Sequence, residues 1–345
     1  MLRQLWRLSR TFEVDGVRMS APAIYAEKHG AGWRAERARE TGYEGVACVD
    51  DAARLAVVLL RAYEEHGLRW ALDWAELNLE FVLYLQQADG NFANFILDWR
   101  GVPNLDGPTS RPGKTPWLSR ALWALATAYR VTGNPRYYDR YHSALKLVPE
   151  GVDHADILAV ILLSALQMHA AGSEPAMLDL VVDVCGRILA YERDGVLLNY
   201  PTETTPHLWG FLQPAALCLA ARALDRPDWV EPARVTARRC LEPVVRDRFR
   251  GPRTLPFEVS CTVSNLDALH VVTGDPVCAK LAAQARLWFY GRNPAEQPVY
   301  DQERGMVFDG IDGEVINQNS GAESNIEGAL ALFEELPWRE YRLTS

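Results

Sequence analysis

The sequence lacks the motifs that bind a metal ion or a nucleotide. The spacings HxxxH, HExxH and CxxC do not occur, so we expect no structural or catalytic zinc. The phosphate-binding patterns GxxxxGKS, GxxxxGKT and GxGxxG are also missing, and no GxSxG turn for a nucleophilic serine occurs. These absences predict a protein that uses no cofactor.

Long apolar runs and basic runs are missing too. The longest apolar runs, 55–60 and 157–163, are much shorter than the ~20 residues of a membrane span. The net charge is −9 and no run rich in lysine or arginine occurs, which argues against nucleic acid or an anionic membrane as partner. Arginines near the start are not followed by the apolar stretch of a secretion signal. We therefore expect a cytoplasmic protein.

The residues that are present describe an ordinary globular chain that is rich in tryptophan. Of 345 residues, 48% are hydrophobic and 23% are charged, which is near the average for a globular domain. Six cysteines are scattered singly, and most lie within apolar helical patterns, so we expect buried free thiols. The 11 tryptophans either fill the core or offer flat rings that stack on sugars.

Apolar residues recur every three or four positions along most of the chain, which predicts helices. Helices that are apolar on nearly every side, and therefore buried, alternate with helices that have one charged face. Two similar turns, 131–135 and 272–276, each follow an apolar helix and open a charged one. The apolar helices begin near residues 48, 116, 153, 206, 256 and 320, and the charged ones span 22–39, 68–87, 135–147, 175–191, 229–246 and 276–290.

Six such helical hairpins fit a closed ring better than an open array, because an open array leaves one face of each inner helix in water. We therefore predict an all-α fold, a closed (α/α)6 toroid that forms one domain over residues 1–345. A small β-hairpin or loop insertion is expected near residues 295–316. Long loops precede the apolar helices, so the loops should gather at one end of the ring, where sites are built.

Polar residues at this end give the candidate site. Ser320 and Glu323 have the spacing of a capping box at the start of the last apolar helix. Asp50 and Asp51 open an earlier helix, and one cap would explain only one of two adjacent acids. The candidate catalytic residues are Glu323, Asp51 and Asp50. The candidate substrate-binding residues are Trp117, Asp153, His154, Glu203, His207, Trp209, Asp309, Asn317 and Asn319. Carboxylates, amides, histidines and tryptophans suit a polyhydroxylated ligand, although each residue also has a structural interpretation as a cap or core residue.

Four blocks of sequence, 42–54, 87–95, 119–125 and 317–324, together resemble bacterial six-hairpin glycosidase-like proteins. These proteins are often found with glycosyltransferases or glycoside phosphorylases. The resemblance implies the (α/α)6 fold, an oligosaccharide or polysaccharide as substrate, and a functional association with a glycosyltransferase. The chain departs from the pattern at Lys114 and Thr115, where relatives have an acidic segment, and at Ala93, where a histidine is common.

Three functions fit these residues. The first is a glycoside hydrolase of the inverting type, in which Glu323 donates a proton and Asp50 or Asp51 is the base, with the carboxyl groups ~6.5–9.5 Å apart. The second is a sugar epimerase or polysaccharide lyase that uses His154 and His207 to move a proton at carbon. The third is a non-catalytic glycan-binding module, which the missing acidic segment favours.

Overall fold

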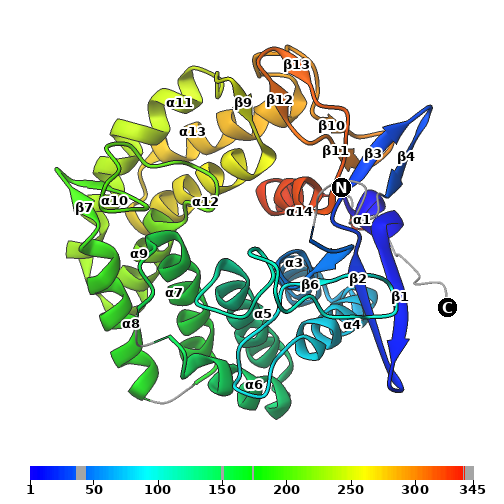
Figure 1. The fold of residues 1–345 in the computed structure, drawn as a ribbon. Coiled ribbons are helices and arrows are strands. Elements are labelled where there is room, and N and C mark those ends of the chain that lie inside the picture. Colours follow the sequence, from blue (N-terminus) through cyan, green and yellow to red (C-terminus); the bar gives the residue numbers. More distant parts are fainter. Residues whose placement is uncertain (36–43, 149–150, 173–174, 337, 339–345) are drawn as a thin grey trace.

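The chain folds into a closed ring of helices in two layers (Figure 1). The computed structural model describes residues 1–35, 44–148, 151–172, 175–336 and 338. Each inner helix packs against the next one along the chain, and the last inner helix packs against the first, which closes the ring and confirms the toroid. The inner helices are α3 (Val49–His66), α5 (Pro116–Thr132), α7 (Ala155–Ala170), α9 (Gln213–Leu224), α12 (Pro256–Thr273) and α14 (Ala322–Ala331).

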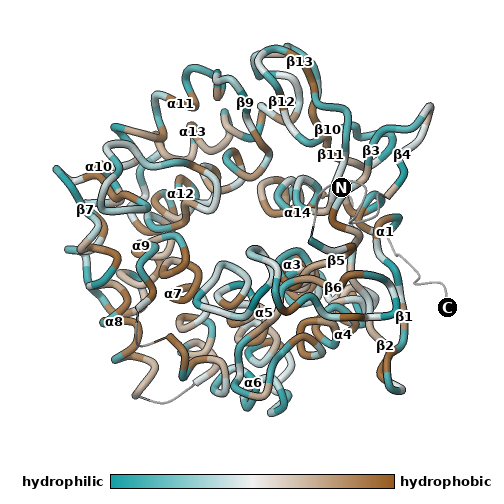
Figure 2. Tube along the Cα trace, in the orientation of Figure 1, coloured by the Kyte–Doolittle hydropathy of each residue, from teal (hydrophilic) through white to brown (hydrophobic). Residues whose placement is uncertain are grey.

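The outer layer pairs with this inner ring. Its members are α4 (Arg69–Tyr84), α6 (Pro135–Leu145), α8 (Pro175–Leu189), α10 (Val230–Thr236), a π-helical segment (Ala237–Leu241), α11 (Glu242–Arg246) and α13 (Pro276–Arg286). The inner helices are buried on most sides, as expected: Leu55, Val58 and Leu59 of α3 have no exposed surface. Figure 2 shows hydrophobic residues along α7 and α8. No helix in the described ranges is long and apolar enough to cross a membrane.

The short turns between layers follow the sequence signals. Gly133 and Gly274 end α5 and α12 in the left-handed region, with φ of 67° and 69°, where a side chain would add strain. The side chains of Asn134 and Asp275 then accept hydrogen bonds from backbone N–H groups in the first turns of α6 and α13. The two similar turns therefore have equivalent roles in two of the hairpins.

The N-terminal region differs from the prediction. The helix expected over 22–39 is wrong: β3 (Ala26–His29) and β4 (Gly32–Ala35) form an antiparallel hairpin there, and residues 36–39 lie outside the described ranges. The outer partner of α14 is instead α1 (Leu2–Leu8), which buries Leu2, Leu5 and Leu8 and is followed by the hairpin of β1 (Ser9–Val14) and β2 (Val17–Pro22).

The physical reason for the hairpin is pairing with distant residues. The Ala26 carbonyl accepts a hydrogen bond from the Ser320 N–H at 3.0 Å, and the Lys28 N–H donates to Asn319 Oδ1 at 3.2 Å. These partners are almost 300 residues away along the chain, so local periodicity carries no trace of them.

The expected insertion before α14 is confirmed. It contains two small hairpins, β10 (Tyr300–Asp301) with β11 (Met306–Val307) and β12 (Ile311–Asp312) with β13 (Val315–Ile316). Strand β12 also pairs with β9 (Arg253–Thr254), so the insertion is attached to the loop that precedes α12. On the other side of the mouth, β5 (Ala47–Cys48) pairs with β6 (Phe95–Ile96). The remaining small hairpin is β7 (Glu192–Arg193) with β8 (Val196–Leu197).

The cap of α14 also differs from the prediction. Gly321, and not Ser320, occupies the N-cap position, and no side chain caps this helix. The Ser320 hydroxyl is buried and donates to the Val307 carbonyl at 2.7 Å, so it is already used between two loops. Asn325 completes this connection, because its Oδ1 accepts from the Val307 N–H at 2.8 Å and its Nδ2 donates to the Gly321 carbonyl at 2.8 Å. The start of α14 is therefore positioned by the insertion.

The connection through Asn325 gives the first prediction. The substitution Asn325→Ala leaves the buried N–H of Val307 without its partner, so it should lower the free energy of unfolding by about 1–3 kcal/mol. Urea unfolding followed by circular dichroism measures the loss. Gln318→Ala, an exposed amide in the same loop, is the control and should change the value by less than about 0.5 kcal/mol. Equal effects of the two substitutions would contradict the role given to Asn325.

Candidate active site

A cavity of about 610 Å³ lies at one end of the ring, where α3, α5, α12 and α14 begin. This volume is within the ~300–1,000 Å³ that small-molecule sites commonly occupy. The N-termini of these four inner helices therefore share one mouth, whereas the residues that begin α7 and α9 do not line the cavity. The polar and aromatic residues that line the cavity include Tyr25, Cys48, Asp50, Asp51, Arg54, Asn94, Trp117, Arg120, Trp209, Arg253, Phe257, Asp309, Glu323 and Ser324.

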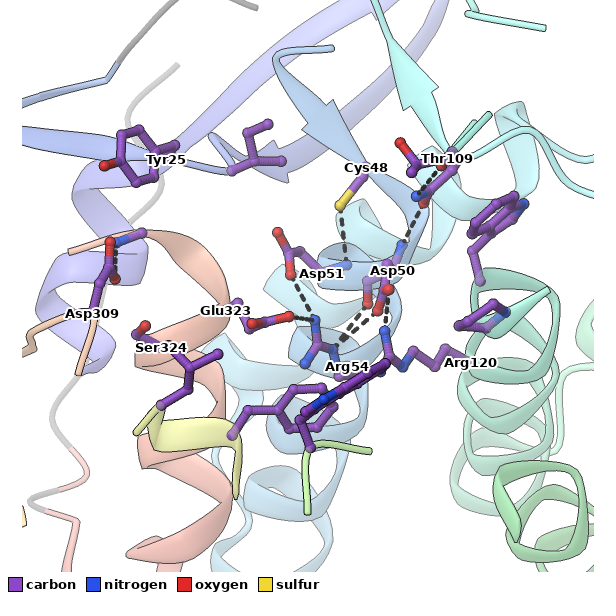
Figure 3. A pocket seen from close by; sticks show the side chains of 18 of the residues that line it. Tyr25, Cys48, Asp50, Asp51, Arg54, Thr109, Arg120, Asp309, Glu323 and Ser324 are labelled. Carbon is purple, nitrogen blue, oxygen red and sulfur yellow. Dashed lines mark hydrogen bonds and ion pairs between the residues drawn. The ribbon is translucent and has the colours of Figure 1, made fainter. Parts of the chain in front are cut away.

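The centre of this site is the guanidinium of Arg54, which is only 3% exposed. Its Nη2 contacts Asp51 Oδ1 at 2.9 Å and Glu323 Oε2 at 3.1 Å, and its Nε contacts Asp50 Oδ1 at 3.1 Å. Its Nη1 is paired with the buried carboxylate of Glu327. Figure 3 shows Arg54 below Asp50, Asp51 and Glu323. One cation therefore holds carboxylates from the first and last inner helices together.

A second arginine also contacts Asp50. Arg120, from α5, pairs through Nη1 with Asp50 Oδ2. The guanidinium groups of Arg54 and Arg120 lie 5.1 and 5.4 Å from the ring centre of Phe257, within the range of cation–π attraction. Burial would raise the pKa of Asp50, but the charges of Arg120 and Arg54 outweigh burial and lower it. Asp50 is therefore ionised at neutral pH.

The neighbouring carboxyl has the opposite behaviour. Burial raises the pKa of Asp51 to about 7, and the negative charges of Asp50 and Glu323 add to this effect against the attraction of Arg54. Burial also raises the pKa of Glu327. Adjacent residues of one helix therefore hold one ionised carboxylate and one carboxyl that keeps a proton near neutral pH. Such a separation is the usual sign of distinct acid and base roles.

A further carboxyl lies apart from the Arg54 cluster in the same pocket (Figure 3). Asp309 accepts a hydrogen bond from the Gly321 N–H at 2.8 Å. Burial raises its pKa to about 6, and the charge of Glu323 contributes. Burial raises the pKa of Tyr25, and the negative charge of Asp309 adds to this effect. The Tyr25 hydroxyl accepts a hydrogen bond from Asn319 Nδ2.

The structure brings about half of the sequence-predicted residues to the cavity. Trp117 lines it but is 7% exposed and donates from Nε1 to the Phe92 carbonyl at 3.0 Å, so most of its ring is core. Asn317 and Asn319 do not line the cavity: Asn317 Oδ1 accepts from the Asn319 N–H at 3.2 Å, and both hold the loop before α14. The predicted residues that line the cavity are Asp50, Asp51, Trp117, Trp209, Asp309 and Glu323.

The other predicted residues form a cluster beside the cavity. His207 Nδ1 contacts Glu203 Oε1 at 3.0 Å, and the rings of His154 and Tyr200 meet edge to face with centres 4.7 Å apart. Neither His154 nor His207 lines the cavity, and Asp153 is exposed in the loop before α7. Within the described part of the chain, no group of histidine, cysteine, aspartate and glutamate side chains could hold a metal ion.

Sequence reasoning missed Arg54, Arg120, Glu327 and Tyr25. A signal existed for the arginines, since each is the one charged residue in a long stretch of its helix, residues 52–60 of α3 and 116–129 of α5. A buried arginine needs a carboxylate, and Asp50 and Asp51 are one helical turn away from Arg54. The partners on α14 and the position of Tyr25 depend on ring closure and had no local signal.

Comparison with other proteins places this site on a shared fold. No protein-family model matches the sequence, and no curated protein matches it. Among solved structures, the chain is similar to a sugar epimerase from a ruminal bacterium, with 12% identity, a TM-score of 0.69, and coverage of 96% of this chain and 95% of that one. It is also similar to a family 76 glycoside hydrolase from a bovine Bacteroides thetaiotaomicron strain (11% identity, TM-score 0.63, 94% and 75% coverage).

A third similar structure is an inactive variant of an α-1,6-mannanase from a Salegentibacter species, in complex with α-1,6-mannotriose (11% identity, TM-score 0.60, 95% coverage of both chains). In that variant two consecutive aspartates are replaced by asparagine. The chain therefore has the (α/α)6 toroid of six-hairpin glycosidase-like proteins, which confirms the fold implied by the resemblance. At these identities the likeness establishes the fold and leaves the reaction to the residues of the site.

The Arg54 cluster gives the second prediction. The substitution Arg54→Met leaves buried carboxylates without their cation, so it should lower the free energy of unfolding by about 3–5 kcal/mol at neutral pH. In the folded variant the unpaired carboxyls would have raised pKa values. The folded state would therefore bind extra protons at a pH below those pKa values. The loss should therefore be smaller at pH 5 than at pH 8.

Urea unfolding at both pH values measures this effect. Arg69→Met is the control, because Arg69 makes an exposed ion pair with Asp73 on α4, and it should leave the unfolding free energy nearly unchanged at either pH. A loss at Arg54→Met that does not depend on pH would argue that packing, and not charge, is what the arginine contributes.

Proposed function

We propose that this protein is a glycoside hydrolase that acts on neutral oligosaccharides. The observation that supports this proposal is the chemistry of the cavity wall. Two carboxyls with pKa values raised to about 7 and about 6 line one cavity, and no histidine of the described chain does. Glycoside hydrolysis requires a carboxylic acid and a carboxylate on either side of the scissile bond.

Asp51 is the proton donor in this proposal. A carboxyl with a pKa of about 7 holds its proton at neutral pH and releases it readily to the leaving oxygen of a glycosidic bond. This assignment differs from the sequence-based one, in which Glu323 donates. Glu323 instead holds Arg54, and its negative charge raises the pKa values of both Asp51 and Asp309.

The base is Asp309, because the inverting mechanism needs a second carboxylate far enough away to admit water. Asp51 Oδ1 and Glu323 Oε2 contact the same nitrogen at 2.9 and 3.1 Å, so these oxygens are at most about 6 Å apart, short of the ~6.5–9.5 Å of inverting enzymes. Asp309 lies apart from this pair and is ionised above pH 6. It is therefore suited to activate water at neutral pH.

The adjacent acids support this assignment from another direction. Asp50 and Asp51 are the one place in the sequence where two aspartates are consecutive. The similar α-1,6-mannanase lost activity when two consecutive aspartates were replaced. In this chain Asp50 is paired with both Arg54 and Arg120, so we assign it the role of holding the two arginines at the cavity wall.

The alternatives are less well supported. A polysaccharide lyase must neutralise a uronate carboxylate, but the arginines that line the cavity, Arg54, Arg120 and Arg253, are each paired with a carboxylate already. Sugar epimerases share the fold, but His154 and His207, which would carry the proton in such a reaction, do not line the cavity. A cytoplasmic location and a functional association with a glycosyltransferase remain predictions from the sequence.

The third prediction concerns activity. On a panel of α-1,6-manno- and β-1,4-gluco-oligosaccharides, Asp51→Asn should reduce hydrolysis by about 10²–10⁴-fold, the usual contribution of general acid–base catalysis. The wild-type rate should fall above pH 7 as Asp51 loses its proton and below pH 6 as Asp309 gains one. Release of reducing sugar as a function of pH measures both limbs.

Asp73→Asn, an exposed aspartate of α4, is the control and should keep full activity. Full activity in Asp51→Asn would remove Asp51 as the donor. Incorporation of solvent deuterium at a product carbon would overturn hydrolysis in favour of the epimerase, and binding of glycans without turnover would favour the non-catalytic module.

The fourth prediction is stereochemical. Because Asp309 is the base, the first anomer released should have the inverted configuration, which proton NMR during early turnover detects. Release of the retained anomer would instead assign the chemistry to carboxyls that lie closer together, such as Asp51 and Glu323. In that case, the substitution Asp309→Asn should have little effect on the rate of hydrolysis.

A further inference from the structure

Trp209 is the one exposed tryptophan that lines the cavity. Its side chain is 45% exposed, whereas Trp117, Phe257 and Phe95 of the cavity wall are at most 9% exposed and Tyr25 is partly buried. An exposed indole is unusual because burial of an aromatic ring stabilises a fold strongly. Its exposure therefore requires a reason beyond packing.

The indole is held in place from one side. Its ring stacks on His207 with centres 4.1 Å apart and planes at 27°. His207 Nδ1 contacts Glu203 Oε1 at 3.0 Å, and Glu203 Oε2 accepts hydrogen bonds from the Asn199 and Tyr200 N–H groups, each at 3.1 Å. A carboxylate bound to backbone thus orients the histidine, and the histidine supports the tryptophan. A ring that is already ordered loses little entropy when a ligand stacks on it.

Trp209 is also separated from the proposed proton donor. Asp51 contacts Arg54, and the guanidinium of Arg54 lies 5.1 Å from the centre of the Phe257 ring. Phe257 in turn lies next to Gly210, since a Cβ added at Gly210 would come 3.8 Å from Phe257 Cζ. The contacts that link Asp51 to the segment carrying Trp209 therefore pass through two side chains, Arg54 and Phe257. A sugar unit at Asp51 leaves the indole free for a different unit.

We propose that Trp209 forms a second sugar subsite, which binds the unit next to the scissile bond and makes the enzyme selective for oligosaccharides over monosaccharides. This inference rests on the proposed function for its substrate class. The flat indole face fits the C–H surface of a neutral pyranose. The cavity of about 610 Å³ is larger than one hexose requires.

The test measures binding by calorimetry in the Asp51→Asn background, so that no substrate is consumed. The probes are mannose, α-1,6-mannobiose and α-1,6-mannotriose, and glucose, cellobiose and cellotriose. Adding Trp209→Ala should weaken binding of the best trisaccharide about tenfold, since one aromatic contact contributes a few-fold to tenfold in affinity, and should leave monosaccharide binding unchanged. His207→Ala, which removes the ring beneath the indole, should weaken trisaccharide binding by a smaller factor.

Trp70→Ala, which removes an indole from the outer helix α4, is the control and should change neither affinity. If Trp209→Ala lowers the affinities for mono- and trisaccharides equally, or lowers neither, the second subsite is overturned and the hydrolase proposal is unaffected. Failure of every probe to bind would overturn both proposals. If Asp51→Asn abolishes hydrolysis but Trp209→Ala leaves the preference for longer oligosaccharides unchanged, the hydrolase proposal stands and the second subsite is rejected.

Discussion

The ion cluster around Arg54 is the interaction on which the site depends. Two of its carboxylates are on α3, the first inner helix, and two are on α14, the last. A buried cation must be paired, and Asp51 and Glu327 also need it because they are buried themselves. The cluster can therefore form only when the two ends of the chain meet. Closure of the ring therefore brings together the residues of the cavity wall, and the insertion positions α14 for this contact through Asn325.

Uneven pairing within this cluster produces the chemistry that we propose. Asp50 contacts two arginines and stays ionised, whereas Asp51 shares one arginine with other carboxylates and keeps its proton near neutral pH. The negative charge of Glu323 raises the pKa values of both Asp51 and Asp309. Burial acts to raise the pKa of both aspartates, and the second arginine at Asp50 reverses that effect there but not at Asp51.

The toroid by itself does not choose between reactions, because similar toroids include a sugar epimerase and a mannanase. The reaction depends on which side chains the loops place in the cavity at the mouth of the ring. In this chain the histidines are used beside the cavity, where His207 supports Trp209, and carboxyls face the cavity itself. The same wall thus separates a reactive part around Asp51 from an aromatic part at Trp209.

The sequence alone determined the helical hairpins, the closed ring, the insertion near 295–316 and the shared mouth, because these follow from apolar periodicity and turn residues that act locally. It also indicated Asp50, Asp51 and Glu323, since polar residues at helix starts stand out against apolar helices, and Asp309, which lies in the long loop before the last helix. Only the tertiary structure decided which acids touch Arg54, that Asn317 and Asn319 hold a loop, and that 22–35 folds as strands paired to the last loop. The contacts of Arg54 with α14, of Asn319 with Tyr25 and Lys28, and of Ser320 with Ala26 join residues hundreds of positions apart. The energies of such contacts do not appear in any local pattern.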